Sequence, residues 1–123
     1  MTSVMDDLGT REAIARFNDA VDRKDAEALR AAITDDCVFE STAPPDGKQY
    51  VGDAMVEIFA KVFALEGEGP FAVEEIFTAG DRAVVRWSHR WDHADGERGH
   101  VRGVDVFRVR HGKVAEKLAY VKG

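Results

Sequence analysis

The chain has 123 residues, a formal net charge of −6 and an isoelectric point near 5.2, and 45% of its residues are hydrophobic. This length and composition predict a single globular domain, residues 1–123. The acidic balance argues against a nucleic-acid partner, which would need a basic face. The lone Cys37 excludes an intrachain disulfide, which fits the cytoplasm, and no stretch approaches the roughly 20 apolar residues of a membrane span.

Three helices are predicted in the N-terminal half. Over residues 10–25, apolar side chains recur at steps of three and four, as on one face of a helix that Thr10 would cap. Asp25 is expected to cap a second helix over 26–33, and Asp53 a third over 54–65. The third helix carries a wide apolar stripe, formed by Met55, Ile58, Phe59, Val62 and Phe63.

From Phe71 onward the apolar pattern changes to a period of two, which is typical of strands. A short strand is also expected over 37–41, followed by a loop over 42–49 that contains two prolines and Asp-Gly. Glu74 and Glu75 should point to opposite faces of their strand. Segregated helices and antiparallel strands define an α+β fold, here a curved sheet with a pocket between it and the helices. The four later strands are predicted over 71–80, 81–91, 100–110 and 113–122.

Asp105 interrupts the apolar run "GVDVFRV" at 103–109. Strand alternation places it on a face with Phe107 and Val109, away from the arginines and under the helices. A buried carboxylate must be hydrogen-bonded, paired or protonated, so Asp105 is a candidate cavity acid or base, or else a structural hydrogen-bonding group. His89 lies on the matching face of the preceding strand and is the candidate proton carrier, with Trp87 on the same face. The strand register, and hence any contact between Asp105 and His89, is left open.

Several other residues have both a structural and a functional interpretation. Val104 and Val106 lie among arginines on the opposite sheet face, which indicates packing against a second copy or cover by the arginine stems. Lys117 shares a face with Ala115 and Ala119, and is expected to be solvated or paired unless that face points into the pocket. Cys37 is interpreted as a small buried hydrophobe. The four histidines lack regular ligand spacing, so no metal site and no cofactor are predicted.

The chain resembles the nuclear transport factor 2-like superfamily, in particular its SnoaL-like and ketosteroid-isomerase-like members. The residues that carry this resemblance are spread over nearly the whole chain: "ARFNDAVDRKDAEALRAAITDDCVFE", "YVGDAMVEIF", "DRAVVRW" and "VRGVDVFRVRHGKVAEKLAYVKG". The resemblance implies a cone-shaped, curved antiparallel sheet that wraps three helices of the N-terminal half around a cavity, a cystatin-like α+β barrel. It also implies a homodimer formed through the outer sheet face.

The resemblance can be tested position by position. Ser41 stands where ketosteroid isomerases have the general-base aspartate, and Phe17 where they have the oxyanion-binding tyrosine. Asp105 matches their protonated acid. In the last strand, Ala119 stands nearest to the position at which SnoaL-like cyclases have their acid/base aspartate. One of three isomerase groups is retained, which argues against steroid isomerisation by that mechanism, and the cyclase mechanism is placed in doubt as well.

These observations lead to a cytoplasmic SnoaL-like protein that binds a small, mostly apolar molecule. As an enzyme it would carry out cofactor-free acid/base chemistry, such as isomerisation, cyclisation or dehydration, with Asp105 and His89 as its catalytic groups. A non-catalytic ligand-binding protein and a protein-interaction domain with a filled interior are the alternatives; membrane and nucleic-acid partners are not expected. The expected pocket residues are Phe17, Phe39, Ser41, Trp87 and Phe107.

Overall fold

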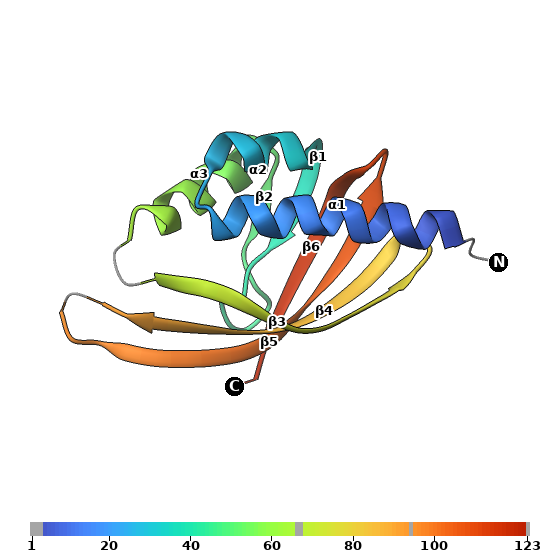
Figure 1. Ribbon diagram of the computed structural model, residues 1–123. Coiled ribbons are helices and arrows are strands. Elements are labelled where there is room, and N and C mark those ends of the chain that lie inside the picture. Colours follow the sequence, from blue (N-terminus) through green and yellow to red (C-terminus); the bar gives the residue numbers. More distant parts are fainter. Residues whose placement is uncertain (1–3, 66–67, 94, 123) are drawn as a thin grey trace.

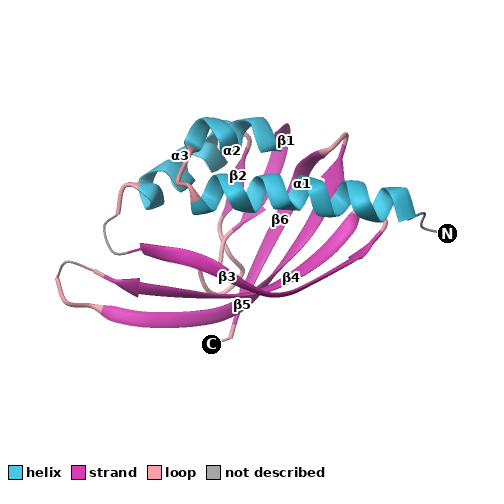
Figure 2. Cartoon of the chain, viewed as in Figure 1, coloured by secondary structure: helices cyan, strands magenta, loops and turns pink. Residues whose placement is uncertain are grey.

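Three helices cover one face of a curved sheet of six strands in the computed structural model, which describes residues 4–65, 68–93 and 95–122 (Figure 1). The helices gather on one side of the sheet, and the hairpin of β4 (Arg82–Asp92) and β5 (Arg98–Arg110) extends beyond them (Figure 2). The predicted α+β class, with three helices over a curved sheet, is therefore confirmed. The elements are α1 (Val4–Asp22), α2 (Ala26–Ala32), β1 (Ile33–Glu40), β2 (Gln49–Val51), α3 (Asp53–Phe63), β3 (Glu68–Ala79), β4 (Arg82–Asp92), β5 (Arg98–Arg110) and β6 (Lys113–Val121).

The sheet is mixed and open, whereas antiparallel pairing throughout was expected. Its strand order is β2-β1-β6-β5-β4-β3, so among the described strands β2 and β3 form the two edges. β1 runs parallel to β6, and every other neighbouring pair is antiparallel. The direction of β1 could not be predicted because its partner is the last strand in the chain, and this long-range pairing leaves no local sequence signal.

The first helix begins earlier than predicted, and Thr10 is an internal residue of α1 rather than its N-cap. Its hydroxyl is buried and donates to the carbonyl oxygen of Gly80 at 2.5 Å. Asp7 Oδ1 accepts hydrogen bonds from the Gly80 N–H and the Thr78 hydroxyl, at 3.0 and 3.2 Å. These contacts dock the first part of α1 on the turn between β3 and β4, so tertiary contacts extend the helix past its predicted start.

The two other predicted caps have different outcomes. The Asp25 carboxylate accepts a hydrogen bond from the Ala28 N–H at 3.0 Å, which confirms it as the cap of α2. Asp53 is the first residue of α3, and the N-cap is Gly52, whose φ of 58° favours glycine. The Asp53 carboxylate instead pairs with Arg30 of α2. α3 ends at Phe63, two residues before the predicted end at residue 65.

The first strand begins at Ile33, which was predicted to end the second helix. Ile33 has extended backbone angles and is buried, and its β-branched side chain favours a strand. β2 was not predicted, and its first residue, Gln49, was expected to end the loop; the strand pairs with β1 and brings Tyr50 opposite Phe39. Both strands are therefore defined by their pairing partners more than by the local pattern.

The core lies between the helices and the inner face of the sheet. Phe17 of α1 packs edge-on against Phe107 of β5, with ring centroids 5.6 Å apart. Gly103 lies opposite Trp87, where an added Cβ would be 2.8 Å from the indole and 2.3 Å from the Tyr120 carbonyl oxygen. The other fully buried large side chains are Ile14, Leu29, Met55, Val85, Val114 and Cys37.

Glu74 and Glu75 both reach the outer face of the sheet, whereas opposite faces were predicted. Glu74 pairs with Arg102 at 2.8 Å and Glu75 with Arg86 at 3.1 Å. A register shift between Val73 and Glu75 breaks the alternation of β3 at this point. An inserted residue of this kind places two consecutive side chains on the same side of a strand.

Candidate functional site

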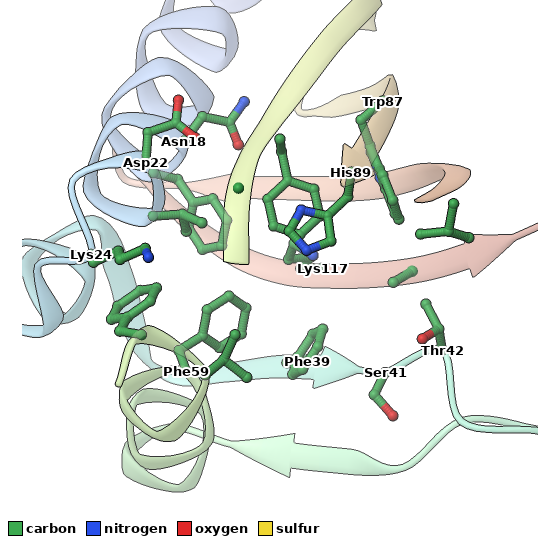
Figure 3. A pocket seen from close by; sticks show the side chains of 18 of the residues that line it. Asn18, Asp22, Lys24, Phe39, Ser41, Thr42, Phe59, Trp87, His89 and Lys117 are labelled. Atoms are coloured by element: carbon green, nitrogen blue, oxygen red, sulfur yellow. The ribbon is translucent and has the colours of Figure 1, made fainter. Parts of the chain in front are cut away.

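A pocket of about 490 Å³ opens between the helices and the inner face of the sheet. α1 and α3 form one wall, and strands β1, β3, β4, β5 and β6 form the floor and the other walls. Phe39 and Phe59 face His89 and Trp87 across this space (Figure 3). Most of the lining is apolar; its polar side chains are Asn18, Asp22, Lys24, Ser41, Thr42, His89 and Lys117, together with the indoles of Trp87 and Trp91.

Aromatic rings stack along the inner face and hold His89 in position. The imidazole of His89 lies flat against Phe71, with ring centroids 4.3 Å apart. Phe71 in turn meets Trp87 edge-on at 5.1 Å, and Trp91 lies 6.0 Å from the imidazole. Because this cluster spans two paired strands, β3 and β4, the histidine is fixed by packing on a rigid element.

A buried ion pair lies at the floor of the pocket. Lys117 of β6 lines the pocket with only 9% of its surface exposed, and its Nζ is 3.3 Å from Asp105 Oδ1. The Nζ also lies 5.0 and 5.7 Å from the ring centroids of Phe39 and Phe59, within cation–π range. Lys117 was expected to be solvated or paired unless its face pointed inward; it is paired and it lines the pocket.

Asp105 is buried on the inner face, as the strand alternation predicts, but it lies beneath the pocket rather than in its lining. It pairs across the sheet with Val85 of β4 and Ala119 of β6. His89 pairs with Val101, four residues away from Asp105 along β5. At about 3.3 Å per residue of strand, this register separates the two candidate catalytic groups by roughly 13 Å.

The expected pocket residues occupy two layers. Phe17, Phe39, Ser41 and Trp87 line the pocket. Phe107 is fully buried under Phe17 and belongs to the core layer below it. The Ser41 hydroxyl accepts a hydrogen bond from the Lys48 N–H at 3.0 Å, so part of its hydrogen-bonding capacity serves the loop after β1.

Two further titratable groups differ in what they can do. Asp22 lines the pocket at the end of α1, and burial raises the pKa of its carboxyl, while a hydrogen bond from the Phe71 backbone N–H opposes the rise. Cys37 is fully buried, and burial raises the pKa of its thiol to about 12. A thiol that stays protonated is a poor nucleophile, so Cys37 packs as a hydrophobe.

The described residues contain one group that could hold a metal ion: His93, Asp95 and Glu97 in the turn between β4 and β5. Their ligand atoms lie within 4.8 Å of one another, and Asp95 and Glu97 are exposed. The Asp95 carboxylate already accepts a hydrogen bond from the Glu97 N–H at 2.9 Å, which is ordinary turn chemistry. The group lies on the turn, outside the lining of the pocket.

Lys117 was the main residue of the site that the sequence interpretation set aside. Its alternation with Ala115 and Ala119 was visible, but a lysine on a strand usually faces solvent. The parallel pairing of β1 with β6 puts Lys117 beside Phe39, and no local sequence pattern indicates this pairing. The apolar stripe of α3 was recognised, and Ile58, Phe59 and Phe63 line the pocket.

The fold and the pocket together define the class: an α+β protein in which a curved sheet and three helices enclose a pocket. The family model described as a SnoaL-like domain matches residues 14–117, and the chain belongs to this family. The predicted resemblance is thereby confirmed. No curated protein sequence matches the chain significantly.

Solved structures agree with this assignment. The chain is 41% identical to an NTF2-like protein of unknown function from Mesorhizobium loti, with a TM-score of 0.81 over 95% of this chain and 93% of that one. Wild-type IdmH of Streptomyces antibioticus, suggested to be a polyketide cyclase, has 20% identity and a TM-score of 0.79, with 92% and 91% covered. An LEH-like epoxide hydrolase of M. tuberculosis has 17% identity and a TM-score of 0.79, with 94% and 84% covered. The latter two likenesses show the shared fold. None of the described helices is both long and apolar enough to cross a membrane.

Proposed function

We propose that the chain binds a mostly apolar small molecule in the pocket and acts on it by cofactor-free acid/base chemistry, such as an isomerisation, cyclisation or dehydration. The observation that carries this proposal is the pocket itself. Its volume of about 490 Å³ lies within the range of roughly 300–1,000 Å³ that is typical of ligand sites. Its walls are mainly aromatic and aliphatic, with a few polar groups to orient a ligand.

His89 is the group we assign to proton transfer. It lines the pocket on a rigid strand, and imidazole is the side chain that titrates closest to neutrality. Asp105 has a different position from the cavity acid expected from the sequence, because its carboxylate contacts Lys117 beneath the lining. We therefore assign Asp105 to holding Lys117 in place rather than to touching the substrate.

The two tryptophans of the chain provide a test of binding. Both Trp87 and Trp91 line the pocket, so a ligand that enters it should change the intrinsic fluorescence. We expect saturable quenching by naphthalene-sized apolar probes. Replacing Ala119, which lines the pocket, by phenylalanine should weaken binding by roughly tenfold through lost space. The matched variant A15F, on the exposed side of α1, should bind like the wild type; equal binding by all three proteins would contradict the proposal.

Catalysis and plain binding are separated by turnover. A panel of enones, epoxides and polyketide-like ketones should include at least one compound that the wild type converts, and H89A should lower its kcat by roughly 10²-fold or more while the Kd stays within a few-fold. Binding without conversion of any compound would favour the non-catalytic alternative. The protein-interaction alternative predicted a filled interior, and the volume of the pocket weighs against it.

We also propose that the outer sheet face binds a second copy of the chain. Apolar side chains cluster there between ion pairs such as Arg102–Glu74, and Phe77 and Tyr120 are about half exposed. The substitution Y120D should convert a dimer into a monomer in sedimentation velocity experiments. L8D, an equally exposed position on α1, should leave the dimer intact, and a monomeric wild type would overturn the proposal. The apolar cluster consists of Phe77, Val84, Val104, Val106, Leu118 and Tyr120.

A further inference from the structure

The ammonium group of Lys117 has more hydrogen bonds to donate than the protein accepts. A lysine ammonium has three N–H donors. Within the described part of the chain, Asp105 is the one hydrogen-bond acceptor of Lys117 Nζ, at 3.3 Å. The other neighbours are the faces of Phe39 and Phe59, which attract the charge but accept no conventional hydrogen bond. Donors of a buried amine are therefore left for a group inside the pocket.

A second unpaired donor lies next to the pocket, on a side chain that lines it. The indole N–H of Trp87 is buried and has no hydrogen-bond partner among the described residues. Buried polar groups are nearly always paired, so an orphaned donor at this position is unusual. The inner face at the pocket therefore holds more donors than acceptors, and Lys117, which lines the pocket, favours a ligand that carries an acceptor.

The charge of the site selects the kind of acceptor. Lys117 and Asp105 form a pair without net charge, and both side chains are about nine-tenths buried. A ligand carboxylate bound to Lys117 would add an uncompensated negative charge next to Asp105, which is costly in an apolar pocket. A neutral carbonyl oxygen accepts a hydrogen bond from the ammonium group at no such cost. The other charged groups of the lining, Asp22 and Lys24, carry opposite charges at the end of α1.

From these contacts we propose that Lys117 binds the carbonyl oxygen of the ligand, and that the ligands of this pocket are neutral ketones, aldehydes or quinones with an apolar body. The inference rests on the proposed function, because it names the ligand class of the same pocket. Asp105 acts as a positioning residue, since its carboxylate holds the ammonium group beside Phe39. In the proposed reaction, His89 accepts a proton from a carbon that is conjugated with the carbonyl. The electron pair of the broken C–H bond moves onto the oxygen, where Lys117 stabilises the resulting enolate. Return of this proton from His89 to another carbon of the conjugated system completes an isomerisation without any co-reactant.

Three matched probes test this assignment: 2-acetylnaphthalene, 2-ethylnaphthalene and 2-naphthoate, which differ in one group. The wild type should bind the ketone roughly tenfold more tightly than the hydrocarbon, as expected for one hydrogen bond from a charged donor. The carboxylate should bind more weakly than the ketone. In K117M the advantage of the ketone should disappear, while the hydrocarbon binds as before. Because K117M leaves Asp105 buried and unpaired, the double variant K117M/D105N provides a second, uncharged form of the site.

A vibrational readout measures the contact directly. The carbonyl stretch of 2-acetylnaphthalene labelled with ¹³C at the carbonyl should shift to lower wavenumber in the wild type, because the ammonium group polarises the bond. The shift should vanish in both Lys117 variants and decrease in D105N, which a purely structural role of Asp105 would not cause. Equal binding of ketone and hydrocarbon, or tightest binding of the carboxylate, would overturn the assignment while leaving the binding pocket supported. Binding of none of the three probes would overturn the proposed function as well.

Discussion

The two faces of the same sheet use charged residues in opposite ways. On the outer face, exposed arginines pair with exposed glutamates, as in the pairs Arg86–Glu75 and Arg102–Glu74. On the inner face one lysine and one aspartate meet under the helices, with 11% and 8% of their side chains exposed. The strand β5 contributes to both arrangements, because Asp105 and Arg102 belong to opposite sides of its alternation.

The exposed ion pairs of the outer face and the buried pair of the inner face differ in what they contribute to the free energy of folding. Exposed pairs gain little because water screens them and competes for both partners. A buried pair must offset the loss of hydration, and an apolar pair of similar size would often be as stable. The presence of Lys117 and Asp105 beside an apolar pocket is therefore better explained by binding chemistry than by stability.

The largest expected effect comes from breaking the inner pair. The substitution D105A leaves Lys117 buried without its partner, and we expect the free energy of unfolding to fall by about 3 kcal/mol. Urea denaturation monitored by circular dichroism measures this change. The apolar double variant K117M/D105L should recover most of the loss. A decrease in D105A no greater than that of an outer-face variant would show that the two faces are energetically alike.

Gly103 provides the next largest effect, because it allows Trp87 to lie flat on the inner face. In G103A the new Cβ would be too close to the Tyr120 carbonyl and the indole of Trp87, and we expect a loss of about 2 kcal/mol by overpacking. The matched control is G9A, at an exposed position of α1 with nothing within 4 Å of the added Cβ. Thermal unfolding monitored by circular dichroism measures both variants. Because alanine favours helices, G9A should be neutral or stabilising in this experiment.

On the outer face, E74Q should have a smaller effect than either inner-face variant. The Arg102 guanidinium lowers the pKa of the Glu74 carboxyl, so the pair stabilises the fold above the ordinary pKa of 4.5. This contribution is lost as the pH falls through the lowered pKa of the folded state. Urea titrations from neutral to acidic pH should therefore show the wild type and E74Q converging at low pH. They should also converge at about 1 M salt, which screens exposed charges; a difference that persists there would contradict the comparison.

The smallest effect on stability is expected for Asp22 in the lining of the pocket. Its dependence on pH is opposite to that of Glu74. Burial raises the pKa of the Asp22 carboxyl above its ordinary value of 3.8, so the folded state favours the protonated form. The associated stabilisation is present at low pH and is lost as the pH rises from 3.8 through the raised pKa. D22N should therefore gain stability relative to the wild type over this window. Carboxyl titration by NMR gives the pKa directly, and a value below 3.8 would refute this prediction.

Local patterns predicted the helices and the meander of β3 to β6 well, since periods of 3.6 and 2 depend on neighbours in the chain. They failed where distant contacts compete: Thr10 became internal because Gly80 and Asp7 extend α1 over a turn, and the bulge of β3 placed Glu74 and Glu75 on one face. For the candidate site, alternation correctly put Asp105 and His89 on the inner face. Alternation could not give the register of β4 against β5, which places His89 opposite Val101, four residues from Asp105.

The sequence alone was sufficient to establish the α+β class, the SnoaL-like resemblance and the inward direction of Asp105, because each depends on alternation or on residue order. The partner of Asp105 was not accessible in this way. Lys117 reaches the pocket because β6 inserts between β1 and β5, which sets it beside Phe39 on one side and Phe107 on the other. Strand order and register arise from packing of the whole sheet, and they convert an isolated aspartate into the support of a buried amine.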